Sequence, residues 1–133
     1  MQSIIKISEA ASIALHSMVY IAGNAGKPAN VKEIAKGFDV SGHHLSKVLQ
    51  RLVKSGLLRS IKGVNGGFII AKSSDQLTFL EIYEAIDGKF PSGSCLFGKQ
   101  SCDSGNCIMG SLITSVNTQV KEFFEDKKLS DFM

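Results

Sequence analysis

The sequence predicts a mainly α-helical domain that carries one small β-hairpin and ends in a long helix. Apolar residues recur every three or four positions in five separate segments, and a glycine-rich turn separates two short apolar runs. No run of about 18 apolar residues occurs, so a membrane span is not expected. The 133 residues are 44% hydrophobic and 20% charged, which is enough apolar material for a buried core.

The opening segment is typical of an amphipathic helix that ends in the stretch Gly23 to Pro28. Glu9 and His16 interrupt its apolar run, and no strongly basic leader precedes it, which argues against a signal peptide. We therefore expect a cytoplasmic protein. The apolar positions that follow helical spacing are Ile4, Ile7, Ala11, Ala14, Leu15, Met18 and Ala22.

Two further helices are expected in quick succession. Asn30 and Glu33 form a reciprocal capping pair for the first, VKEIAKGF. Ser41 caps the second, which runs to about Lys54 and stops at Gly56. A short helix, a turn and a longer helix with a polar stripe make a helix-turn-helix unit. The stripe, spaced by four, three and four residues, is His43, Lys47, Gln50 and Lys54.

A basic hairpin follows this unit directly. Leu57 to Ile61 and Phe68 to Ala71 are expected as strands, joined by the tight turn Gly63-Val64-Asn65-Gly66-Gly67. A hairpin in this position is a wing. Thr78 and Glu81 then predict a capping box for the helix FLEIYEAID, which ends at Gly88.

The rest of the chain is a loop and a final helix. Residues 89–107 are rich in glycine and serine and carry all three cysteines. A lone helix with an apolar face as wide as the last one needs a partner surface, although it can also pack only on its own domain. Its apolar positions are Met109, Leu112, Ile113, Val116, Val120, Phe123 and Phe124. We therefore divide the chain into residues 1–88, 89–107 and 108–133.

Charge separates the middle of the chain from its end. Residues 28–72 hold eight Lys and Arg against two acids, a balance of +6, whereas residues 73–133 hold five against nine, a balance of −4. A basic middle suggests a polyanionic partner. The third predicted helix, capped by Ser41, would be the recognition helix, which can enter a major groove with its N-terminal end toward the bases. The alternative is a winged helix used only as a protein-interaction module.

The expected DNA contacts come from the third helix and the wing. The helix N-terminus, with Ser41 and Gly42, can hold a phosphate. The wing residues can reach the DNA backbone or the minor groove. The candidates are Ser41, Gly42, His43, His44, Lys47 and Arg51 on the helix, and Arg59, Lys62, Asn65 and Gly66 on the wing.

The cysteines form a second candidate site. Cys95, Cys102 and Cys107 lie within thirteen residues, and their odd number argues against a structural disulfide set in a cytosolic protein. Thiolates are soft ligands, so three from one loop suit an iron–sulfur cluster or zinc. The absence of a CxxC pair weakens a zinc-ribbon interpretation. Thiol-based sensing without a metal and a structural zinc site remain alternatives.

An enzyme is not expected. The sequence has no phosphate-binding glycine loop, no nucleophile elbow and no metal-hydrolase helix motif. Three cysteines would suit a small redox enzyme or electron carrier, but that role does not require a helix-turn-helix and a wing.

The residues together resemble the Rrf family of winged-helix transcription regulators, in particular its iron–sulfur cluster regulators of the IscR and NsrR type. The matching segments, in order, are ALHSMVYIA, VKEIAKGFDVSGHHLSKVLQRLVKSGLL, KGVNGGFIIAK, LTFLEIYEAIDG and the cysteine loop with its following helix. Lys62 and Asn65 stand where the family often has Arg and Gly. The resemblance implies a homodimer, joined by the C-terminal helix, on a palindromic operator. Residues 1–88 would then bind DNA and residues 108–133 would dimerise.

The resemblance also implies a cofactor. Three such cysteines hold a [2Fe-2S] or [4Fe-4S] cluster that senses nitric oxide, redox state or iron status, and the regulator would act as a repressor. Gly110 replaces the histidine that some members carry after the last cysteine. Other members use a side chain from the partner's opening helix, where Ser12 occupies their acidic ligand position. His16 is the favoured fourth ligand and Glu9 the second. A histidine packed in a helix interface is the alternative for His16.

Overall fold

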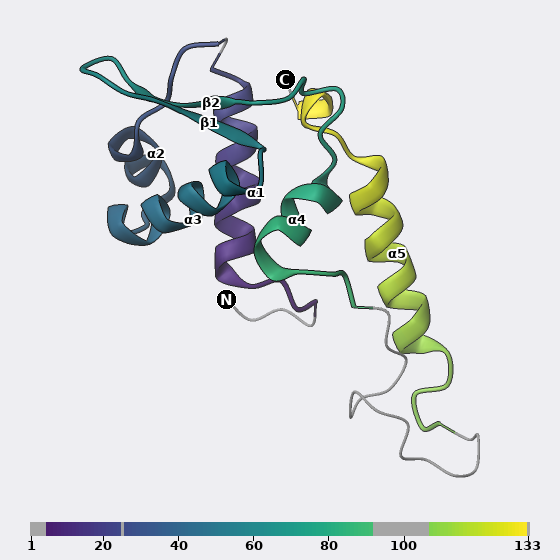
Figure 1. The fold of residues 1–133 in the computed structure, drawn as a ribbon. Helices are drawn as coiled ribbons and strands as arrows, with labels where there is room; N and C mark the ends of the chain where they lie inside the picture. The colour runs from purple at the N-terminus through teal and green to yellow at the C-terminus, as the bar shows by residue number, and fades with distance from the viewer. Residues whose placement is uncertain (1–4, 25, 92–106, 133) are drawn as a thin grey trace.

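The structure, a computed structural model, describes residues 5–24, 26–91 and 107–132. It confirms a mainly α-helical fold with one antiparallel hairpin (Figure 1). Within the described residues no helix is long and apolar enough to cross a membrane. The elements are α1 (Glu9–Ala22), α2 (Val31–Phe38), α3 (Gly42–Lys54), β1 (Leu58–Ile61), β2 (Gly67–Ile70), α4 (Phe79–Asp87), α5 (Leu112–Asp126) and the 3-10 helix η1 (Leu129–Phe132).

The predicted helix caps account for most of these boundaries. At α2 the Asn30 side chain accepts from the Glu33 N–H at 2.9 Å, and the Asn30 N–H donates to the Glu33 carboxylate at 3.1 Å. At α3 the Ser41 hydroxyl accepts from the His44 N–H at 3.0 Å. Each cap pairs amide groups that the first turn of a helix leaves without a partner.

One helix start and one helix cap differ from the sequence prediction, whereas α4 spans the predicted residues FLEIYEAID. The opening helix begins at Glu9 because the Ser8 hydroxyl caps it, so Ile7 precedes the helix. At α4 the Thr78 hydroxyl accepts from the Glu81 N–H at 3.2 Å, which is one half of the predicted capping box. The Glu81 carboxylate lies 3.4 Å from the Lys72 ammonium, because the segment that follows β2 brings that lysine beside the helix.

The turn of the helix-turn-helix depends on a residue that the sequence analysis did not single out. Asp39 ends α2 in the left-handed conformation, with φ 54° and ψ 47°. Aspartate tolerates this conformation better than most residues with a Cβ. The reversal lets α3 start three residues later at Gly42 and pack against α2.

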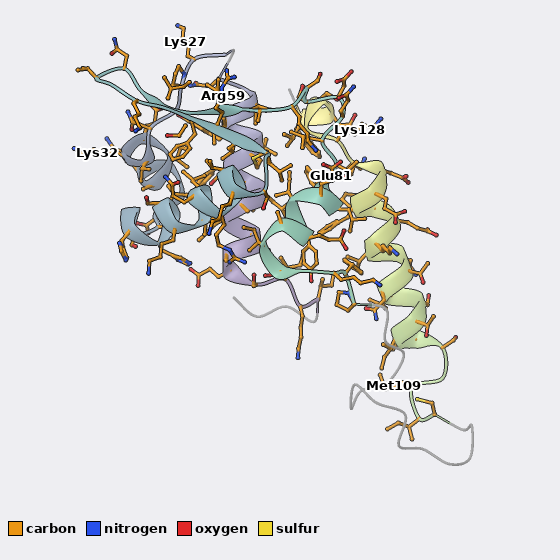
Figure 2. The ribbon with its side chains drawn as sticks, viewed as in Figure 1. Lys27, Lys32, Arg59, Glu81, Met109 and Lys128 are labelled. Carbon is orange, nitrogen blue, oxygen red and sulfur yellow. The ribbon has the colours of Figure 1, made fainter. Side chains whose placement is uncertain are left out.

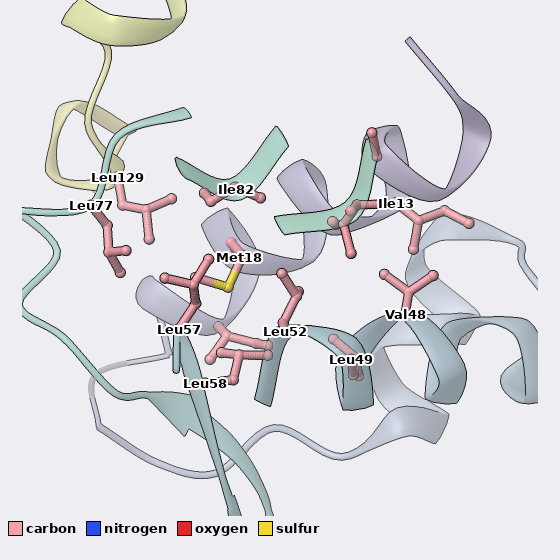
Figure 3. Close-up of a cluster of buried hydrophobic side chains, with 14 of the residues drawn as sticks. Ile13, Met18, Val48, Leu49, Leu52, Leu57, Leu58, Leu77, Ile82 and Leu129 are labelled. Carbon is pink, nitrogen blue, oxygen red and sulfur yellow. The ribbon is translucent and has the colours of Figure 1, made fainter. Parts of the chain in front are cut away.

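One hydrophobic core joins these elements around α1. Figure 1 shows α1 between the α2–α3 pair with its hairpin and the α4–α5 pair. Figure 3 shows Met18 of α1 in the middle of the buried cluster, with Ile82 of α4 to one side and Leu52 of α3 to the other. Ala11 and Ala14 are fully buried on the same helix, and such small side chains let neighbouring elements approach closely.

The segment that follows α5 folds back onto the start of α4. The Leu129 side chain is fully buried, and its N–H donates to the Leu77 carbonyl at 3.0 Å. The Phe79 N–H donates to the Lys127 carbonyl at 2.9 Å. These two hydrogen bonds attach the end of the chain to the start of α4.

The wing is attached to the helix-turn-helix through a pair of glycines. Phe68 and Ala29 exchange two backbone hydrogen bonds of 2.8 and 3.0 Å, which join β2 to the segment before α2. Gly67 has φ 153°, and a Cβ there would lie 2.4 Å from the Ala29 carbonyl oxygen. A Cβ on Gly66 would lie 2.1 Å from the Ile61 carbonyl oxygen. The close approach of these backbones therefore requires both glycines.

We predict that Gly67→Ala lowers the free energy of unfolding by about 1–3 kcal/mol, because its methyl group has to displace the Ala29 backbone. Gly37→Ala is the matched control. It lies within α2 with no atom within 4 Å of the added Cβ, so it should raise stability by about 0.5–1 kcal/mol. Urea unfolding at one fixed protein concentration measures both variants. Equal effects would contradict the assigned role of the glycine pair.

Candidate DNA interface and cysteine site

The third helix presents the predicted polar stripe to solvent. His43, Lys47, Gln50 and Lys54 are all exposed. The opposite face is buried through Leu45, Val48, Leu49 and Leu52, and this packing sets the rotation of α3 about its axis. The stripe therefore stays available for a ligand.

The other predicted contacts near the start of α3 differ in exposure. Ser41 and Gly42 are exposed, whereas His44 is half-buried against the body of the domain. The Ser41 hydroxyl is engaged as the helix cap. An exposed helix N-terminus carries partial positive charge and suits a phosphate.

The hairpin carries the wing residues at its edge and tip. Arg59 lies on β1, and Lys62 and Asn65 lie in the turn, all three exposed. Gly66 is half-buried, and its missing side chain is needed for the turn itself. In Figure 1 the tip of the hairpin extends past α2, so that the wing and the helix-turn-helix share one end of the molecule.

Most of the exposed cations of residues 28–72 lie at the end of the molecule that the wing and the helix-turn-helix share. In Figure 2, Lys32 lies on α2 and Arg59 on the hairpin, while Lys128 lies on the other side of the molecule. Apart from Lys72, which pairs with Glu81, and Arg51, which reaches α4, the cations of residues 28–72 lie on α2, α3 and the hairpin. Their potential would attract a polyanion to that end.

Arg51 behaves differently from the other candidate DNA contacts. Although much of the residue is exposed, its Nη2 donates a hydrogen bond to the Ile86 carbonyl of α4. The side chain thus reaches from the recognition helix to the carboxyl end of α4. Its predicted contact with DNA stays a prediction.

Only one of the three cysteines lies within the described residues. Cys107 is a half-buried free thiol, and the Met109 N–H donates to its sulfur at 3.4 Å. Gly110, with φ 58°, closes the same turn through a 3.0 Å hydrogen bond from its N–H to the Cys107 carbonyl. Cys95 and Cys102 lie outside the described residues. Within the part of the chain that is described, no three His, Cys, Asp or Glu side chains converge as metal ligands.

The two candidate fourth ligands lie on α1 in different clefts. The His16 Nδ1 lies 2.7 Å from the Ser12 carbonyl, which can only accept, so Nδ1 carries a proton and Nε2 is the nitrogen that a neutral ring could offer to a metal. His16 lines an apolar cleft of about 620 Å³ with Phe38 and Phe123, and its ring contacts Phe38 edge-on. Glu9 lines a separate cleft with Asp87 and Pro91.

An aromatic cluster, which the sequence analysis did not identify, connects α4 to α5. Phe124 of α5 is buried against Tyr83 and Phe90, with ring centroids 5.8 and 6.2 Å apart. Burial raises the pKa of Tyr83, and the carboxylates of Asp87 and Glu84 raise it further. The spacing of the aromatic residues predicted α5 itself, but it did not predict which residues would pack against Phe124.

A basic helix-turn-helix with a wing and a long C-terminal helix defines the class of the protein, which is a winged helix-turn-helix transcription regulator. The family model of Rrf2, described as iron-dependent transcriptional regulator, matches residues 7–133. The chain therefore belongs to the Rrf2 family of DNA-binding transcriptional regulators and is not an enzyme.

Individual relatives agree with this assignment. An HTH-type transcriptional regulator of Aquifex aeolicus is 30% identical over 95% of this chain and 90% of its own. The regulator IscR of Sodalis glossinidius is 27% identical over 90% and 73%. The structure of CymR, the global cysteine regulator of B. subtilis, aligns with a TM-score of 0.79 at 25% identity over 96% and 95%. The structure of T. potens IscR aligns with a TM-score of 0.72 at 22% identity over 96% and 85%.

We predict that Lys47→Ala weakens binding to an operator duplex, selected from a random-sequence pool by the wild-type protein. Loss of one phosphate contact should also reduce the slope of log Kd against log salt by about 0.9. Fluorescence anisotropy at several salt concentrations measures both effects. Lys128→Ala removes the same charge from the other side of the molecule and should leave the slope unchanged. Equal slopes for the two variants would show that Lys47 does not contact DNA.

Proposed function

We propose that the protein is a homodimeric repressor whose operator affinity is controlled by an iron–sulfur cluster bound through Cys95, Cys102 and Cys107. The observation that carries the proposal is the environment of Cys107. A backbone N–H already points at its sulfur, five residues before α5 begins. Hydrogen bonds to the sulfurs of cysteine ligands are one of the means by which a protein tunes an iron–sulfur cluster.

The choice of a cluster also fits the opening helix. The His16 Nδ1 proton is held by the Ser12 carbonyl, and such a bond commonly fixes the ring of a metal-binding histidine so that Nε2 can coordinate. We propose His16, from the partner subunit, as the fourth ligand and Glu9 as the second candidate. When bound, the cluster would supply a centre that reacts with nitric oxide or oxidants or is lost when iron is scarce.

The homodimer is supported by apolar surface that the chain itself leaves uncovered. Leu112, Phe123 and Phe132 are 53%, 50% and 51% exposed. The last two line the 620 Å³ cleft that also contains His16. Figure 1 shows the amino-terminal end of α5 projecting beyond α4. A second α5 seated on this surface would bury the apolar stripe and bring His16 to a subunit interface.

Control of DNA binding would work by linkage. The cysteine loop lies between α4, which packs on the helix-turn-helix, and α5, which carries the proposed dimer surface. Ligands that hold the loop in one arrangement favour one spacing of the two recognition helices. Operator affinity changes when that arrangement is lost, by the difference in free energy between the two states.

A thiol switch without metal is the second candidate function. The structures that resemble this chain include an oxidized form of Staphylococcus aureus CymR, with a TM-score of 0.73 and 21% identity. A thiol switch would use one reactive cysteine and a reversible disulfide or sulfenic acid.

A spectrum of protein purified without oxygen tests the cluster. We predict absorption between about 320 and 460 nm, with iron and acid-labile sulfide present, as Cys-ligated iron requires. Cys107→Ser should abolish the absorption, whereas Ser115→Ala, on the exposed surface of α5, should retain it. A colourless and iron-free wild-type protein, even after reconstitution, would reject the cluster in favour of the thiol switch.

The dimer surface is tested separately. Phe123→Glu places a charge on the apolar cleft and should weaken self-association by about 2 kcal/mol or more, as for a residue at the centre of an interface. Gln119→Glu adds the same charge one turn earlier, at an exposed polar position of α5, and should remain dimeric. Sedimentation velocity over a concentration series measures both. A dimer that tolerates Phe123→Glu would show that another surface is used.

A further inference from the structure

We infer that Arg51 is a positioning residue, which fixes the recognition helix to the carboxyl end of α4 and through it to the base of the cysteine loop. The structure shows the required contact, because the Arg51 Nη2 donates to the Ile86 carbonyl. The inference deepens the proposed function and rests on it where it concerns signalling.

The carboxyl end of α4 needs a cation from elsewhere. The last four carbonyls of a helix lack partners in the helix and carry partial negative charge. The last turn of α4 contains no basic residue. Arg51 of α3 supplies the charge, and the Gly88 N–H satisfies the Glu84 carbonyl at 3.1 Å.

Two further contacts meet at this helix end. The Asp87 carboxylate accepts from the Ser8 hydroxyl at 2.6 Å and from the Ser8 N–H at 3.3 Å, which attaches α4 to the first turn of α1. The Phe90 N–H donates to the Glu84 carboxylate at 2.9 Å. Phe90 is buried beside Tyr83, with ring centroids 5.3 Å apart.

These contacts connect three parts of the molecule at one point. Phe90 fixes the residues that lead into the cysteine loop, whose first cysteine is five positions further along the chain. Ser8 fixes the end of α1 that carries Glu9. Arg51 fixes the last turn of α3, one position after Gln50 of the exposed polar stripe. A shift of the loop base therefore moves the end of α4, and the guanidinium transmits that shift to the recognition helix.

A positioning role differs measurably from contact with DNA. Arg51→Met keeps much of the aliphatic stem but removes every donor and the charge. We expect weaker operator binding with the wild-type dependence on salt, since no phosphate contact is lost. Lys47→Ala, four positions earlier on the same helix, is the matched control whose salt slope should fall. A fall of about 0.9 in the slope for Arg51→Met, or wild-type affinity and slope, overturns the inference.

The signalling part is tested by comparing cluster-loaded and cluster-free full-length protein on the same operator duplex. We expect the ratio of the two affinities to shrink about fivefold or more in Arg51→Met, while the absorption spectrum stays that of the wild type. Asp87→Ala is a second variant, because it removes the two hydrogen bonds between Ser8 and α4 while Ser8 can still cap α1. It should shrink the ratio in the same direction, and a wild-type ratio in either variant overturns the inference.

The two proposals fail in distinguishable ways. A wild-type protein without a cluster rejects the proposed sensing mechanism on its spectrum alone. The salt slope of Arg51→Met still decides between positioning and phosphate contact in that case. Circular dichroism confirms that each variant is folded before its affinity is compared.

Discussion

The apolar face of α1 packs against α3, α4, β2 and η1, and this burial holds together parts of the chain that are far apart in sequence. Ala11, Ala14 and Met18 are fully buried there, so the neighbouring elements approach the helix closely. Interiors packed at this density transmit small displacements rather than absorbing them. The helix that carries both candidate fourth ligands is therefore also the helix against which the recognition helix is seated.

The two ends of the molecule have opposite physical character. Around α2, α3 and the wing, apolar side chains face inward and cations face solvent, which is the arrangement that a polyanion requires. Along α5, by contrast, Phe124 is buried against aromatic side chains of the chain itself, whereas Phe123 and Leu112 remain exposed. Exposed apolar surface of this kind is typical of an interaction site. A regulator needs both surfaces and a connection between them, and the carboxyl end of α4 lies between the two.

Much of the fold could be predicted because its signals are local. Asn30 with Glu33, and Ser41 ahead of His44, satisfy amides within three residues, so the sequence alone locates the starts of α2 and α3. The glycine pair in the wing could also be recognised in the sequence, since only glycine lets the backbone approach Ile61 and Ala29 so closely. The exposed stripe of α3 followed from helical periodicity. Cys107 was identified from composition and resemblance, whereas the hydrogen bond to its sulfur depends on a turn that no pattern indicated.

The remaining features depend on which elements become neighbours, and spacing along the chain cannot supply that information. Arg51 and Lys47 are both basic residues of one helix, yet only the packing of α4 on α3 gives Arg51 a carbonyl to bind. Glu81 pairs with Lys72 instead of completing its cap because the segment that follows β2 brings Lys72 beside α4. Ser8 reaches Asp87, 79 positions away, for the same kind of reason. The sequence by itself determined the helices, the wing and the family through short-range hydrogen bonds and periodicity. The tertiary structure alone decided which polar groups meet, because those contacts form only after the hydrophobic core has brought distant segments together.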